Sequence, residues 1–331
     1  MNSFGVIFKI SLFGESHGPA IGVTIDGCPP GIAVSQNDFM VDLKRRQSGN
    51  RGTTKRQEPD QPEILSGIFN GVTTGAPVTI ITRNTNTISS DYEEFKKVPR
   101  PGHADFVSHI KYSGFSDMRG SGHFSGRITW ALVAAGVIAK KIAGNAIISA
   151  ELISAGGSEN IENAIDEAIA LNDTIGGIIE CKVKNPPIAV GEPFFYSFES
   201  AVSHIIFSIP AIKGIEFGSG FASAAMLGSK HNDPYIDENG KTSTNNAGGI
   251  NGGITNGNEI VFRTVVKPTS STGVDQNTFD FSAEKMTTLK VKGRHDTCIA
   301  LRMPVIVEAA TAIAIADLIL IDRGIHGRRD I

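Results

Sequence analysis

The chain has 331 residues, of which 40% are hydrophobic and 20% are charged, the balance of a folded globular protein rather than a disordered or collagen-like one. Its formal net charge of −3 argues against a nucleic-acid binder that relies on overall basicity. The three cysteines are too few and too scattered for a disulfide framework, and no CxxC pair suggests zinc, so we expect a reducing, cytoplasmic setting and no metal.

The first half of the chain predicts strands, one helix and a long irregular segment. Runs of apolar and β-branched residues predict strands at 4–13, 21–26 and 78–82. Ser35 is the expected N-cap of a short helix that leads into the basic segment 44–56. Residues 84–126 are loop-rich and polar, which in a compact chain favours a functional role. The N-terminus lacks the positive segment of a signal peptide.

The second half mixes buried helices with strands. Residues 127–142 are apolar almost all round, which predicts a buried helix. Further helices are expected at 161–171, 198–209 and 305–322, and strands at 148–155, 177–184 and 259–266. The last apolar run contains Glu308 and Asp317, so we expect a core helix and no membrane span. With no linker in the sequence, residues 1–331 predict a single compact α+β domain.

Glycine is unusually frequent and gathers beside reactive side chains. There are 37 glycines in 331 residues, about 11% of the chain, whereas glycine makes up roughly 7% of an average protein. They cluster in GESHG (14–18), RGSGHFSG (119–126) and NNAGGINGGITNG (245–257). Because the first two clusters contain histidine, serine or arginine, we expect backbone that approaches a ligand closely rather than simple turns.

The first cluster matches G-x-S-x-G, the nucleophile motif of α/β-hydrolases. That motif requires a following helix, whereas residues 19–27 predict a second strand. A serine hydrolase acting through Ser16 is therefore the weaker alternative. His17, held between glycines at a strand end, is better placed as an acid or base, although a turn-capping histidine is the alternative.

Two further segments are suited to anions. Residues 119–126 resemble the dinucleotide motif G-x-G-x-x-G, but the spacing is one residue too long, so only anion binding at the start of the next helix is expected. The basic segment 44–56 could grip phosphate or carboxylate through its arginines. Its alternatives are a solvated face, or the anion-binding surface of a non-catalytic RNA-binding protein.

Two loops combine histidine, aspartate and arginine, in RPGHAD (100–105) and KGRHD (292–296). Asp296 lies among cationic residues, which should keep it ionised and able to accept a proton. A hydrogen-bonded turn in the first loop and a local salt bridge in the second are the alternatives.

Taken together, these segments resemble the chorismate synthase family along nearly the whole chain. The matching stretches are FGESHGPAIGVTIDGCPPG, RRQSGNRGTTKRQEPDQPEILSGIFNG, RPGHAD, RGSGHFSGR, SIPAIKGIEFGSGF, TNNAGGINGGITNG, VVKPTSS and KGRHD. Eight segments in the same order are far more specific than any single motif.

The resemblance implies a sandwich with helices between antiparallel β-sheets, in a homotetramer. It also implies a 1,4-anti elimination of phosphate from 5-enolpyruvylshikimate-3-phosphate that gives chorismate and needs reduced FMN. NADPH is the reductant where a member of the family reduces its own flavin. Nucleic-acid and membrane partners are not expected.

The resemblance also implies roles for five residues. His17 looks like the acid that protonates the departing phosphate, and His103 like the group that steadies the reduced flavin near its N1. Asp296 looks like part of the route that takes the C6 proton by way of flavin N5, assisted by Ser16 and Ser125.

Binding residues carried over in the same way form two sets. The substrate-binding set is Arg45, Arg46, Arg51 and Arg127. The cofactor-binding set is Arg45, Arg51, His123, Phe124, Ser125, Ala211, Gly252, Lys267, Pro268, Thr269, Ser270, Ser271 and Arg294. The family loop that usually reads RSSAR is HFSGR here, so a titratable His123 stands where a permanent cation is usual.

Overall fold

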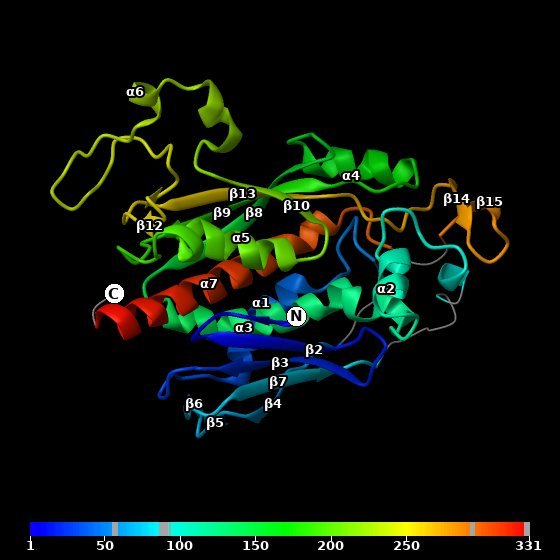
Figure 1. Ribbon diagram of the computed structural model, residues 1–331, viewed down its shortest axis with the longest axis horizontal. Coiled ribbons are helices and arrows are strands. Elements are labelled where there is room, and N and C mark those ends of the chain that lie inside the picture. Colours follow the sequence, from blue (N-terminus) through cyan, green and yellow to red (C-terminus); the bar gives the residue numbers. More distant parts are fainter. Residues whose placement is uncertain (55–58, 86–91, 93, 292–294, 328–331) are drawn as a thin grey trace.

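Two antiparallel β-sheets enclose a layer of helices (Figure 1). This computed structural model describes residues 1–54, 59–85, 92, 94–291 and 295–327. Buried apolar side chains from both sheets and from the helices between them form one continuous core. The sandwich predicted from the family resemblance is therefore confirmed.

The lower sheet in Figure 1 has five strands, and each neighbouring pair is antiparallel. In spatial order they are β1 (Ser3–Phe4), β2 (Lys9–Gly14), β3 (Ala20–Asp26), β7 (Val78–Arg83) and β4 (Glu63–Ser66). The central strand β3 buries Ile21, Val23 and Ile25 at alternate positions, as expected of a sheet with one face against the core.

The upper sheet has four antiparallel strands. Their order is β10 (Ile212–Phe217), β13 (Ile260–Val266), β9 (Gly177–Lys184) and β8 (Ile147–Ala155). In β9 the buried residues Ile179, Cys181 and Val183 alternate with more exposed ones, so its apolar face also points to the helices.

The helices between the sheets are α1 (Gln36–Arg46), α3 (Thr129–Ile142), α5 (Phe198–Ser208) and α7 (Met303–His326). The short α4 (Ile161–Ala170) contacts β8 on the outer side of the upper sheet. By length and composition the helical stretch Ile299–His326 could cross a membrane, but 94% of its most apolar window is buried inside the protein. It is a core helix, as its sequence predicts.

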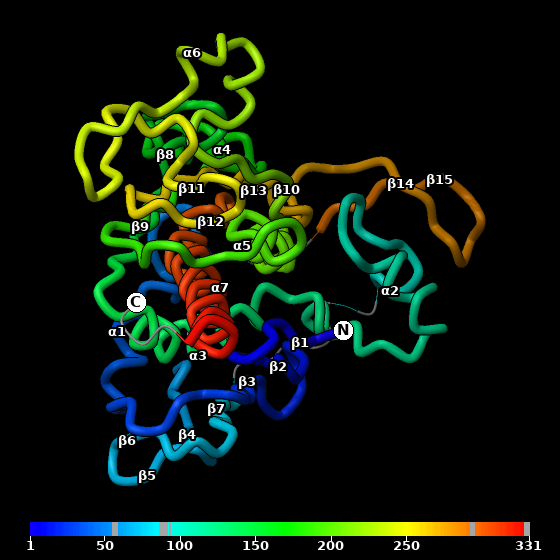
Figure 2. The backbone as a smooth tube through the Cα atoms, turned by 60° about the vertical axis from the view of Figure 1, so that its left-hand side comes forward, coloured from blue at the N-terminus to red at the C-terminus, as the bar shows by residue number. Residues whose placement is uncertain are grey.

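The remaining elements are short. They are β5 (Ile68–Phe69), β6 (Val72–Thr73), β11 (Ile250–Asn251), β12 (Ile254–Thr255), β14 (Gln276–Asp280), β15 (Lys285–Leu289), α2 (Asp105–Lys111) and α6 (Gly228–His231). Figure 2 shows α2 and the β14–β15 hairpin together at one side of the molecule, where Phe106 stacks on Phe281 at 5.0 Å between ring centroids. Short 3₁₀ segments lie at Glu94–Lys96, Arg119–Phe124, Gly126–Ile128, Phe194–Tyr196, Gly220–Ala225 and Ile299–Arg302, and residues 120–122 interrupt the second of them with non-helical backbone.

The prediction of one strand over 4–13 is wrong. The chain turns at Gly5, which has a φ of 95°, and forms two strands that pair with each other. The Asp317 carboxylate on α7 accepts hydrogen bonds from the backbone N–H groups of Val6, Ile7 and Phe8 at 2.8–3.0 Å. The turn at residues 6–8 is therefore stabilised by a residue more than 300 positions away, and no local sequence pattern predicts it.

Several other elements were not expected, among them β4, the β14–β15 hairpin, α2 and β10. The loop-rich segment 84–126 contains the helix α2, and the strand β10 follows α5 directly. The residues of β10 are mostly half-buried and include a lysine, a glycine and a glutamate, so they lack the apolar alternation that identifies a strand.

Candidate functional site

A cavity of about 710 Å³ lies where β2, α1, α5 and β13 end and where α3 and α7 begin. This volume is in the range of small-molecule sites. Many of the residues predicted from sequence line it, namely Ser16, Arg46, His103, His123, Phe124, Ser125, Arg127, Ala211, Lys267, Pro268, Thr269, Ser270 and Asp296. Residues far apart in the sequence therefore meet around one space.

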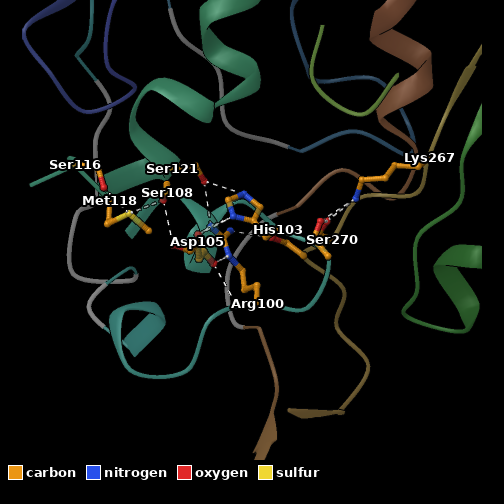
Figure 3. Close-up of polar contacts among 11 residues, drawn as sticks. Arg100, His103, Asp105, Ser108, Ser116, Met118, Ser121, Lys267 and Ser270 are labelled. Atoms are coloured by element: carbon orange, nitrogen blue, oxygen red, sulfur yellow. Dashed lines mark hydrogen bonds and ion pairs between the residues drawn. The ribbon is translucent and has the colours of Figure 1, made fainter. Parts of the chain in front are cut away.

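One wall of the cavity is organised by a buried carboxylate (Figure 3). The Asp105 side chain is 1% exposed and accepts hydrogen bonds from Arg100 Nε at 2.7 Å and Nη2 at 2.8 Å. Its Oδ1 also lies 2.6 Å from Nδ1 of His103. Burial acts to raise the pKa of Asp105, but the hydrogen bonds from Arg100 and His103 outweigh it and hold that pKa well below its usual range.

This carboxylate assigns the tautomer of His103. Since Nδ1 donates to Asp105, Nε2 is the acceptor nitrogen of the neutral ring, and it lies 3.3 Å from Ser121 Oγ. Arg100 Nη2 is 3.1 Å from Nδ1 because both donors share the same carboxylate oxygen. His103 is thus held with its basic nitrogen toward Ser121, as the dashed contacts in Figure 3 show.

A strained loop brings the second histidine to the same place. Gly120, Ser121 and Gly122 have φ values of 59°, 67° and 50°, a left-handed run that only glycine adopts readily. A Cβ on Gly120 would lie 2.5 Å from His17 Nε2 and 2.7 Å from Ser16 Oγ, so these two atoms flank one glycine. His17 is buried with its ring edge against Tyr92 and does not itself line the cavity.

A second wall is cationic. Asp60 forms ion pairs with both Arg46 and Arg127, and the Arg46 side chain is 2% exposed. Burial and the nearby Arg302 guanidinium lower the pKa of Arg46 to about 9. Since this value is still above neutral pH, Arg46 remains charged there. Arg302 in turn pairs with Asp296 at 3.2 Å. One aspartate shared by two arginines leaves positive charge at the cavity.

Asp296 is held in place by a second donor. Its Oδ1 accepts the backbone N–H of Thr54 at 2.6 Å, while Oδ2 faces Arg302. These two contacts fix a carboxylate on the cavity wall, at the end of the loop that sequence analysis singled out.

Two lysines line the side of the cavity nearest β10 and β13. Lys267 Nζ donates to Ser270 Oγ at 2.7 Å and to the Gly102 carbonyl at 3.2 Å. Ser270 Oγ also donates to that carbonyl at 2.8 Å, which ties this loop to the one that carries His103. Burial and the neighbouring Lys213 lower the pKa of Lys267. A site where two ammonium groups disfavour each other is suited to an anion.

The glycine loop between these walls carries His123, Phe124 and Ser125. His123 Nδ1 lies 3.3 Å from the Gly14 carbonyl and Nε2 lies 3.0 Å from Asn2 Oδ1, so both ring nitrogens have partners. Ser125 Oγ accepts the backbone N–H of Arg127 at 3.3 Å and caps the turn before α3. The loop therefore presents side chains to the cavity rather than free N–H groups alone.

Besides His17, the predicted residues Arg45, Arg51 and Gly252 do not line this cavity. Arg45 forms a two-pronged ion pair with Glu308, both contacts at 2.7 Å. Arg51 is 74% exposed and pairs with Asp166 of α4 at 2.6 Å. Gly252 lies in the β11–β12 turn.

The last two predicted residues are Ser271 and Arg294. Ser271 does not line the cavity but accepts a hydrogen bond from Arg100 at 3.0 Å, so it supports the wall with His103. Arg294 lies outside the described residues. Sequence reasoning missed Lys213 and Arg302, which both line the cavity. Lys213 stands within the matching stretch SIPAIKGIEFGSGF, but no charge pattern distinguished it from an ordinary surface lysine.

The hydrolase alternative lacks its required geometry. Ser16 lies in a turn that runs from β2 directly into the antiparallel strand β3, and its backbone N–H donates to the Gly122 carbonyl. A nucleophile elbow needs a helix after the serine.

Comparisons with known proteins identify the family of the chain. A family model described as chorismate synthase matches residues 8–320. A chorismate synthase of Chitinophaga pinensis is 57% identical and covers 98% of each chain. One of Thermococcus kodakarensis is 42% identical over 98% of this chain and 99% of its own. A solved structure, "Crystal Structure of Chorismate Synthase", has a TM-score of 0.73 and 26% identity, covering 95% of this chain and 92% of that one. The chain therefore belongs to the chorismate synthase family, whose members are carbon–oxygen lyases.

Proposed function

We propose that this enzyme eliminates phosphate from 5-enolpyruvylshikimate-3-phosphate to give chorismate, with reduced FMN as cofactor, in the cavity described above. The observation that carries the proposal is that two different walls, one with acid–base groups and one with cationic groups, line the same cavity. One holds His103 and Ser16, whose Oγ flanks the same glycine as Nε2 of the buried His17, and the other holds Arg46, Arg127 and Arg302. Acid–base groups and anion-binding groups thus face the same space.

The charge of the cavity suits the substrate. This substrate carries two carboxylates and a phosphate, and guanidinium groups bind such anions by paired hydrogen bonds. Within the part of the chain that the structure describes, Asp60 is the only carboxylate that pairs with Arg46 or Arg127, so their positive charge is not fully neutralised. We propose that these arginines orient the substrate.

The lysine side of the cavity is suited to the cofactor. Lys213 and Lys267 offer two cations for the FMN phosphate, and Phe124, Ile209 and Pro210 offer apolar surface for a planar ring. Ala211, with a φ of 74°, brings its backbone to the same wall. When bound, reduced FMN supplies electron density to the allylic phosphate and recovers it after the elimination.

Proton transfers fall to the chain's own residues. We propose that His17 gives the proton that assists departure of the phosphate, through the adjacent Ser16, whose Oγ flanks the same glycine as His17 Nε2. His103 takes up and returns a proton near the flavin at Nε2, since its Nδ1 proton is donated to Asp105. Asp296, with Ser125, accepts the proton removed from substrate carbon. Such transfers are typically worth about 10²–10⁴-fold each.

Family membership is the ground for the remaining proposals. These are a single catalytic domain, a cytoplasmic homotetramer, and NADPH as reductant if the enzyme reduces its own flavin. Substrate or cofactor contacts by Arg45 and Arg51 also remain proposals, because neither side chain lines the cavity of this chain.

The test is anaerobic turnover with reduced FMN, with and without NADPH, following phosphate release and the absorbance of chorismate. We expect one phosphate per chorismate with reduced FMN, and turnover from oxidised FMN plus NADPH only if the enzyme reduces its own flavin. A His17→Ala variant should lose at least about tenfold in kcat while it still binds FMN. A matched His231→Ala variant changes a histidine of α6 whose contact is Ser223, and since neither residue lines the cavity it should keep its activity. Folded protein that releases no phosphate would overturn the proposal.

A further inference from the structure

A second cluster of ligating side chains lies at the far end of α7 from the cavity. Asp322 and His326 are one helical turn apart on α7, and Glu192 comes from the loop before α5. One ligand atom from each residue lies within 4.8 Å of the other two. At about 1.5 Å per residue, Asp322 is roughly 30 Å along the helix from Met303, which lines the cavity.

The buried negative charge of Asp322 needs a positively charged or hydrogen-bonding partner. The residue is 4% exposed, and its buried Oδ2 has no hydrogen-bond partner among the described residues. Within that same part of the chain no lysine or arginine forms an ion pair with it. A buried carboxylate without a partner is costly, since burial removes its hydration and nothing replaces it.

His326 and Glu192, the other two residues of the cluster, have the spacing of two ligands on one metal ion. His326 Nε2 lies 3.2 Å from Glu192 Oε1. In tetrahedral zinc sites with bonds of about 2.0–2.1 Å, two ligands are roughly 3.3 Å apart. A protonated histidine beside a glutamate would give the same spacing, but it would leave the third, buried carboxylate uncompensated.

We propose that Asp322, His326 and Glu192 bind a Zn²⁺ ion. One imidazole and two carboxylates match the ligands of zinc sites, whereas Ca²⁺ and Mg²⁺ prefer oxygen ligands alone. The side chain of His326 is 47% exposed, so water has access to a fourth position. Because no cysteine takes part, the absence of CxxC in the sequence gives no sign of this site.

The ion would fasten a loop to the core. Glu192 is followed closely by Phe194 and Phe195, which are 86% and 90% exposed. Phe194 also has a φ of 67°, a conformation that a bulky residue adopts only when its surroundings enforce it. Joining Glu192 to α7 supplies such a constraint, and the site therefore has a structural role.

The test uses the full chain after removal of metals by a chelator. Co²⁺ serves as a visible substitute for Zn²⁺, and both are titrated against the wild type and against His326→Gln and Asp322→Asn. We expect one tight equivalent, a tetrahedral Co²⁺ absorption band and a rise in Tm with Zn²⁺ for the wild type. Each variant should lose more than the roughly 10–100-fold in affinity that follows loss of an outer partner of a metal site.

His109→Gln is the matched control, since His109 is an exposed histidine on α2 and should leave binding unchanged. Circular dichroism of the metal-free variants verifies that they fold. Equal metal affinity in the wild type and His326→Gln would overturn the proposal, and so would a wild type without a stoichiometric metal. A Tm that responds to His326→Gln but not to metal would assign the cluster to a simple ion pair. None of these outcomes depends on turnover.

Discussion

At the scale of single residues, Asp105 determines how His103 can act. It is the only described carboxylate that contacts both Arg100 and His103, and it is almost fully buried. An asparagine at this position keeps the shape but replaces one acceptor oxygen with an NH2 donor, so it cannot accept from Arg100 Nε, Arg100 Nη2 and His103 Nδ1 together. The position of the imidazole and its tautomer then lose their common support.

We therefore expect Asp105→Asn to lower kcat by about 10²-fold or more, because the general acid–base contribution of His103 depends on its tautomer. KM should change much less, since Asp105 does not line the cavity. Steady-state kinetics with reduced FMN measures both values, and the ring nitrogen shifts of His103 in NMR report the tautomer. An unchanged kcat would show that His103 needs no such support.

The depressed pKa of Asp105 also predicts an acid dependence of stability. In the unfolded chain an aspartate titrates near about 3.9, so in acid the unfolded state binds more protons than the folded state. The stabilisation by Asp105 is thus present above that pKa and is lost as the pH falls through its folded value. Urea unfolding should show the wild type and Asp105→Asn differing most near neutral pH and converging below about pH 4. A constant difference would contradict this.

At the scale of elements, the loop of residues 119–124 links the two histidines. There is no room for a side chain at Gly120, because a Cβ there would lie 2.4 Å from His17 Cδ2. The φ of Gly120 is 59°, in the left-handed region. Left-handed backbone costs a residue with a Cβ roughly 1–2 kcal/mol. The loop therefore depends on glycine for both conformation and contact.

Gly120→Ala should displace His17 or the loop and lower turnover by at least about tenfold, with only a modest loss of stability. Gly228→Ala is the matched control, since a Cβ on Gly228 meets nothing within 4 Å. Turnover and thermal unfolding of the two variants separate the effects. If Gly120→Ala retained full activity, the position of His17 against this loop would not matter for catalysis.

Element boundaries also show how far the sequence alone can lead. The buried helix α3 and the core helix α7 were predicted within a few residues, since an apolar run of that length has few alternatives. Arg45 and Arg46 could not be told apart. Successive residues of a helix point about 100° apart, so one faces the cavity and the other Glu308, and only the packing of α1 decides which.

At the scale of the whole molecule, Asp317 connects the first strands to the last helix. Its carboxylate accepts the backbone N–H groups of Val6, Ile7 and Phe8, of which Phe8 is fully buried. Burial raises the pKa of Asp317, and these hydrogen bonds oppose that rise. The fold class followed from the family resemblance, but this contact depends on how the layers meet and has no signature in either segment.

Asp317→Ala should lower the free energy of unfolding by about 1–3 kcal/mol, because it leaves a buried backbone N–H group without its acceptor. Asp275→Ala is a suitable control, since Asp275 is 62% exposed and has only a 3.7 Å contact with Lys290. Urea titration of both variants gives the comparison. Equal stabilities would mean that water satisfies the turn at residues 6–8.

The position of α7 has a consequence for how the chain acquires its structure during synthesis. The helix spans residues 303–326 and fills the space between the two sheets. A protein leaves the ribosome N-terminus first, so both sheets are made before this helix. Until the helix has emerged, the apolar inner faces of the two sheets are left without the helix that covers them. Nascent chains should therefore remain prone to aggregation and dependent on chaperones until residues 303–326 have left the ribosome.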